Sequence, residues 1–97
     1  MPSSEPIMLT PAEATELLNE GEYIHNFAQA GFALLGCDYP RAEAIKAFED
    51  AESIELGGEG CQRMKHPIVV FEKGGRHTFF EADMDKVYAK FPDERAA

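Results

Sequence analysis

The segment KHPIVVFEKGGRHTFF, residues 65–80, limits the possible folds more than any other part of the chain. Two runs of β-branched and aromatic residues meet at Gly74 and Gly75. A glycine pair tolerates the positive φ angles that a two-residue hairpin turn requires. The sequence therefore predicts a β-hairpin over residues 67–82.

The length of this turn determines which side chains share a face of the hairpin. With two residues in the turn, Phe71 faces Thr78, and Ile68, Val70 and Phe79 lie together on the opposite face. Both faces are then partly apolar, so each is covered by a helix or forms a contact surface. The strip of Ile68, Val70 and Phe79 is the alternative interface, which a homodimeric assembly or regulatory factor would use.

A helix is expected close to the N-terminus. Thr10 as N-cap, Pro11 at the first helical position and Glu13 three residues after the cap form a capping box. This helix is expected to end at about Glu20, because Gly21 supplies a left-handed exit.

Two more helices are expected before the hairpin. Apolar residues recur near the helical period over residues 22–35, although Gly31 weakens a helix there and GFALLGC also fits a short buried strand. Whether this segment is one helix or a helix–strand pair stays open. Residues 40–51, PRAEAIKAFEDA, carry one apolar stripe and predict a helix.

The rest of the chain completes an α+β fold. Residues 53–56 fit a short third strand, and MDKVYAKF, residues 84–91, follows Asp83 as N-cap of a last helix. The expected architecture is three N-terminal helices, a β-hairpin, either alone or with the third strand as a three-stranded antiparallel sheet, and a short C-terminal helix.

Size and hydropathy favour a single small globular domain over residues 1–97, with 1–8 and 92–97 as loose tails. The start MPSSEPIM lacks the basic and apolar regions of a secretory signal. The longest apolar stretch, residues 28–37, is much shorter than the roughly 20 residues of a membrane-spanning helix. A cytoplasmic protein without a membrane partner is expected.

Negative charge is the most informative functional feature of the sequence. The chain carries 18 acidic and 9 basic side chains, a net charge of −9, and the excess lies within residues 1–59. Two groups of carboxylates are candidate partner-binding residues. They are Glu13, Glu16 and Glu20 on the first helix, and Glu49, Asp50, Glu52, Glu55 and Glu59 at and after the third.

These carboxylates have two interpretations. They form a solvated face that keeps a small protein soluble, or they imitate a run of phosphates and bind a basic protein surface, that of a nucleic-acid-handling protein. The size and charge of the chain are similar to those of small acidic inhibitors that act as DNA mimics, including some anti-CRISPR and anti-restriction proteins of phages. No motif carries this likeness, so it assigns neither a family nor residue roles.

Direct binding to nucleic acid is not expected. Three helices followed by a hairpin resemble a winged helix, in which residues 40–51 would read DNA and residues 67–82 would form the wing. That reading helix would be net acidic where phosphates must bind, because two basic residues stand against three acidic ones.

Cysteine and histidine residues give no recognisable catalytic or metal-binding motif. Structural zinc sites usually bring ligands in close pairs, whereas Cys37, Cys61, His66 and His77 are mostly far apart. We expect a protein that is not an enzyme and binds no metal or other cofactor. A thiol or metal site at Cys61, His66 and His77 remains a further alternative.

Overall fold

The structure, a computed structural model, describes residues 7–30, 33–57 and 64–94 of the chain. A 3-10 helix, η1, follows the last α-helix. The elements in chain order are β1 (Ile7–Met8), α1 (Pro11–Glu16), β2 (Tyr23–Ala30), β3 (Ala33–Pro40), α2 (Arg41–Asp50), β4 (Ser53–Leu56), β5 (Ile68–Phe71), β6 (His77–Phe80), α3 (Met84–Lys90) and η1 (Pro92–Glu94).

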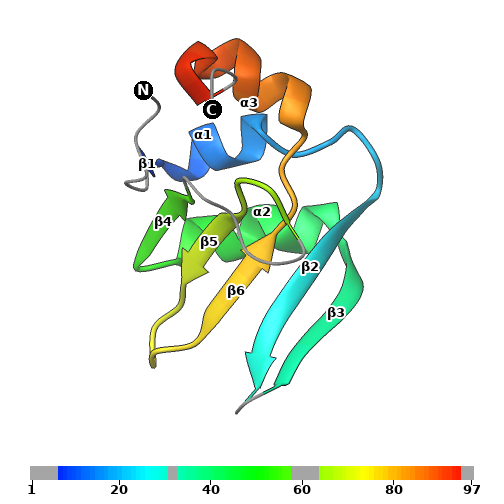
Figure 1. The fold of residues 1–97 in the computed structure, drawn as a ribbon. Coiled ribbons are helices and arrows are strands. Elements are labelled where there is room, and N and C mark those ends of the chain that lie inside the picture. The colour runs from blue at the N-terminus through cyan, green and yellow to red at the C-terminus, as the bar shows by residue number, and fades with distance from the viewer. Residues whose placement is uncertain (1–6, 31–32, 58–63, 95–97) are drawn as a thin grey trace.

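The strands form one six-stranded sheet in the order β1-β4-β5-β6-β2-β3, and every neighbouring pair is antiparallel. In Figure 1, α2 lies behind the strands, and α1 and α3 stack at one end of the sheet. The hydrophobic core lies between the helices and the sheet. The opposite side of the sheet, called the outer face below, carries no helix within the described residues (Figure 1).

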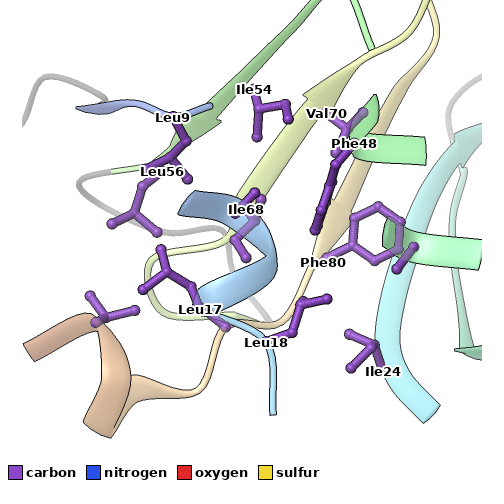
Figure 2. Close-up of a cluster of buried hydrophobic side chains, with 14 residues drawn as sticks. Leu9, Leu17, Leu18, Ile24, Phe48, Ile54, Leu56, Ile68, Val70 and Phe80 are labelled. Atoms are coloured by element: carbon purple, nitrogen blue, oxygen red, sulfur yellow. The ribbon is translucent and has the colours of Figure 1, made fainter. Parts of the chain in front are cut away.

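Every described helix contributes to the core. Figure 2 shows Leu17 and Leu18, from the end of α1, close to Ile68 of β5. The Phe80 ring of β6 receives the edge of Phe48 from α2, with 5.4 Å between ring centroids. Such edge-to-face pairs are a favoured geometry for buried aromatic rings. The sheet is therefore held against all three helices by a continuous apolar cluster.

The expected helix over residues 22–35 is wrong. This segment enters β2 and β3, which pair directly from Tyr23 with Pro40 to Ala30 with Ala33. The apolar spacing fits a strand as well, because β2 buries Ile24 on the core side and Phe27 on the outer side. With β3 in place of a helix, the order of elements no longer matches a winged helix.

The register expected for the second hairpin is also wrong by one residue. Phe71 pairs with His77, and the backbone N–H of Glu72 donates to the carbonyl of Arg76 at 2.8 Å. The loop between them has one residue more than a two-residue turn, and Gly74 and Gly75 in it have φ angles of 95° and 89°. A shift of one residue exchanges the two faces of one strand relative to the other.

The elements predicted from short stretches of neighbouring residues are present in the structure. Thr10 and Glu13 form the predicted capping box, although α1 ends at Glu16 rather than near Glu20. The helices expected at 40–51 and 84–91 and the strand at 53–56 are present as α2, α3 and β4. Within the expected tails, the described parts form secondary structure, as β1 at one end and η1 at the other.

Candidate functional site

The carboxylates predicted on the first helix, two in α1 and Glu20 after its end, are at least partly solvent-exposed but form ion pairs with lysines of α3. Glu20 Oε1 lies 2.6 Å from Lys86 Nζ, and Glu16 Oε2 lies 3.2 Å from Lys90 Nζ. Glu13 Oε2 is 3.9 Å from the same Lys90 Nζ. The hydrogen bond from Lys86, and then its charge, lowers the pKa of Glu20 below 4.5. These three residues therefore connect the first helix with the last.

Glu13 and Lys86 also form hydrogen bonds with backbone groups. Glu13 Oε1 accepts a 2.9 Å hydrogen bond from the N–H of Thr10, and this bond is the largest cause of its lowered pKa. Lys86 Nζ also donates to the carbonyl of Leu18 at 2.8 Å. The α1 carboxylates thus have a role within the fold that the sequence analysis did not assign.

The second predicted group of carboxylates differs from the first in its contacts. Glu49 and Asp50 end α2, Glu52 follows directly, and all three side chains are exposed. Within the described residues, none of the three belongs to an ion pair. Glu55 belongs to β4, where it pairs with Val69 on the outer face and is half-buried. We call Glu49, Asp50 and Glu52 the α2-terminal acidic group; Glu59 lies outside the described residues.

An open groove of about 510 Å³ continues this acidic group along α2. Its lining residues come from α2, the end of β3 and the β5–β6 loop, and are Tyr39, Glu43, Lys46, Ala47, Asp50, Glu72 and Lys73. Burial first, and then the charges of Glu43 and Glu72, raise the pKa of Tyr39 above 10. Both carboxylates thus contribute negative potential at the Tyr39 hydroxyl.

A buried pair of polar side chains was not expected from the sequence. His66 and Glu94 are 2% and 4% exposed, and His66 Nδ1 lies 3.7 Å from Glu94 Oε2. The same Nδ1 is 3.1 Å from the carbonyl oxygen of Gly57. Among the residues that the structure describes, neither His66 Nε2 nor Glu94 Oε2 has a hydrogen-bond partner. This pair is a contact between η1 and the segment that precedes β5.

The backbone at this pair is unusual as well. His66 has a φ of 51°, in the left-handed region that few residues other than glycine adopt. Such a conformation costs on the order of 1–3 kcal/mol and persists where the surroundings fix it. No pattern in the sequence connects position 66 with position 94, which was expected to lie in a frayed tail.

The further alternative, a site at Cys61, His66 and His77, is not assembled by the described residues. His66 is buried beside Glu94, whereas His77 lies on the outer face with its ring against Phe71, at 4.7 Å between centroids. Cys61 is outside the described residues. No cluster of three or more His, Cys, Asp or Glu side chains suited to a metal ion occurs in the part of the chain that the structure describes.

The alternative interface is divided between the two sides of the sheet. Ile68 and Val70 are fully buried on the core side, whereas Phe79 pairs with Val69 on the outer face. The outer face also carries Phe71, and Val69, Phe71 and Phe79 are half-buried. The one-residue change of register is the cause, because it moves Ile68 and Val70 to the side of Phe80.

The described residues define an α+β domain whose antiparallel sheet is covered by helices on one face. Comparison of the chain with known protein families, with curated proteins and with solved structures finds no match. None of the described helices has the length and apolar character needed to cross a membrane.

Proposed function

We propose that this chain is a non-enzymatic interaction protein that binds a basic protein surface through the α2-terminal acidic group. The partner is a nucleic-acid-handling protein, and the chain acts on it as an inhibitor that takes the place of nucleic acid. The observation that carries this proposal is the exposure of Glu49, Asp50 and Glu52 without an ion pair inside the described residues.

The contrast with α1 supports a role outside the fold for this group. Glu13, Glu16 and Glu20 form ion pairs with Lys86 and Lys90 of α3. Among the described residues the α2-terminal acidic group has no such contact, and α2 has no basic residue in its last turn. The three predicted residues of α1 are therefore left out of the proposed surface.

The position of the group is unfavourable for the helix itself. A helix C-terminus carries a partial negative charge, so carboxylates there are destabilising and lysines are favourable. Glu49 and Asp50 occupy the last two positions of α2. A partner that supplies arginine or lysine side chains would relieve this repulsion, which gives the free energy of binding a physical source.

The chemistry of the partner follows from charge. A surface that binds phosphates carries clustered arginine and lysine side chains, and carboxylates can pair with the same groups. The attraction extends over roughly 10 Å at 0.1 M salt and is screened as salt increases. Binding of this kind is therefore expected to be fast and to weaken steeply with ionic strength.

The test is affinity capture at low salt, followed by elution with a salt gradient and mass spectrometry. The proposal requires a basic nucleic-acid-binding protein that leaves at moderate salt. The purified partner should then bind either the chain or duplex DNA, so that added DNA displaces the chain. Simultaneous binding of both would contradict the mimicry.

A matched pair of triple variants locates the surface. Replacement of Glu49, Asp50 and Glu52 by lysine should abolish binding and leave the fold intact, because lysine suits the end of α2. The control replaces three exposed acidic residues elsewhere, which are Glu22, Glu81 and Asp93. Both triples change the net charge equally, so equal losses of affinity would show that total charge, not this surface, determines binding.

A further inference from the structure

β3 forms one edge of the sheet and leaves a long row of backbone groups open. It pairs with β2 along all eight residues from Ala33 to Pro40 without a bulge. Among the described residues, no strand pairs with its other side (Figure 1). The opposite edge of the sheet is β1, which has two residues. Proteins usually shorten, bend or charge an edge strand, since an open edge pairs readily with another strand.

The hydrogen-bond pattern shows which residues of β3 offer their backbone outward. The N–H of Arg41 donates to the carbonyl of Glu22 at 2.8 Å, so this pair is of the hydrogen-bonded type. Such pairs alternate along an antiparallel ladder. It follows that Leu34, Gly36 and Asp38 direct their N–H and C=O groups away from β2.

We propose that two copies of this chain pair antiparallel through β3, about a two-fold axis at Gly36. Gly36 then forms a hydrogen-bonded pair with Gly36 of the second copy, and Leu34 comes opposite Asp38 of the second copy. The glycine suits the axis because it adds no side chain there. Its place on the outer face is filled by the Phe27 ring, whose Cε1 would lie 2.5 Å from a Cβ at Gly36.

Two observations favour a second copy over another kind of strand. When β3 of one chain pairs with β3 of the other, the long edge of each sheet is covered and the assembly closes at two chains. The remaining edge of each sheet, β1, has two residues and is too short to add a further chain. The charge on the edge is also compatible with a copy of itself. Asp38 is the single charged residue of β3, lies 3.8 Å from His25 of its own chain, and pairs with position 34 of the second copy, so no two like charges of β3 meet across the axis.

The first experiment measures the mass of the full chain in solution by light scattering and sedimentation over a range of concentrations. The mass of two chains is expected, and a single chain at all concentrations would overturn the proposal. Asp38→Pro should give monomers, because proline removes an N–H that points outward and leaves the bonds to β2 intact. Asp38→Ala is the matched control and should remain dimeric.

A second edge variant covers the case in which Asp38→Pro fails to fold, as judged by circular dichroism. Leu34→Lys places a charge on the open edge, a common natural protection of edge strands, and should also give monomers. Phe79→Asp on the outer face should leave the dimer intact. A dimer that survives both edge variants and dissociates with Phe79→Asp would overturn the edge pairing in favour of the outer face.

Cross-linking tests the register of the pairing. Cys37 is an exposed free thiol. In the proposed register it comes opposite Leu35 of the second copy, so the two Cys37 residues are diagonal neighbours roughly 7–8 Å apart. In a Cys61→Ser background, a short bismaleimide should join the two chains. Asp93→Cys in a chain without Cys37 and Cys61 is the control, which should pair in solution without forming a covalent cross-link; cross-linking equal to that control would overturn the register.

Salt separates this inference from the proposed function. Two chains of net charge −9 repel each other, so added salt should strengthen the dimer. The same salt should weaken the binding of the α2-terminal acidic group to a basic partner. Failure of the one interaction is therefore distinguishable from failure of the other.

Discussion

The buried pair of His66 and Glu94 allows a quantitative test of what holds the C-terminal part of the chain. The two groups are almost fully buried, with 3.7 Å between His66 Nδ1 and Glu94 Oε2. With His66 protonated and Glu94 ionised, unit charges about 4 Å apart attract by about 4 kcal/mol at an effective dielectric constant near 20. Desolvation offsets part of this attraction, so we expect a coupling free energy of about 2 kcal/mol.

A double-mutant cycle measures this coupling. Glu94→Ala removes the carboxylate without a new contact, and His66→Asn keeps a residue that tolerates the φ of 51°. The free energy of unfolding of the four proteins is obtained from urea denaturation followed by circular dichroism. The free-energy cost of the cavity left by each substitution cancels in the cycle as long as the two sites respond independently.

The control cycle uses the exposed pair of Glu16 and Lys90, whose side chains are 64% and 32% exposed. Solvent screens this pair, so its coupling should not exceed about 1 kcal/mol. A coupling below about 0.5 kcal/mol for His66 and Glu94, or one no larger than that of the control, would refute the reasoning. The C-terminal turn would then be held by apolar contacts alone.

Three further predictions concern single positions. Gly36→Ala should destabilise the fold by about 1–3 kcal/mol in urea denaturation, because its Cβ would meet the Phe27 ring; Phe27→Leu should restore part of the loss. Glu20 has a pKa below 4.5 through Lys86, so its contribution is complete above pH 4.5 and is lost as the pH falls through the lowered pKa. Glu20→Gln should therefore flatten the acid side of the stability profile, and an unchanged profile would contradict this. Ultraviolet titration, with Tyr39→Phe to identify the signal, should show Tyr39 ionising above pH 10; ionisation at or below pH 10 would exclude the inferred burial and negative potential.

The elements that could be predicted are those specified by neighbouring residues. α2 has its apolar stripe in one ten-residue segment, and Asp83 caps α3 by accepting from the N–H of Asp85. β2 and β3 could not be predicted in this way, because an apolar residue at the helical period also fits a strand. What decides between them is the pairing of β2 with β6, which joins Asn26 to Phe80 across the sequence.

For the candidate site too, the features visible in the sequence were those set by nearby residues, and the others depended on the fold. The spacing of the α1 carboxylates was visible in the sequence, and the spacing of Lys86 and Lys90 by one helical turn could have identified their partners. The exposure of the α2-terminal acidic group needed the fold. His66 and Glu94 meet through tertiary packing alone, and one additional residue in a glycine loop was enough to move Ile68 and Val70 from the proposed interface into the core.

The place of β6 in the sheet has a consequence for the order of folding. β6 is the last strand in the sequence, yet it lies between β5 and β2. The β2–β3 hairpin and the pair of β4 and β5 can each form from nearby residues, but among the described residues strand pairing joins them only through β6, which pairs with both β2 and β5. Closing so long a loop is slow relative to forming either part. The two parts of the sheet therefore become one cooperative unit only after residue 80 has been synthesised.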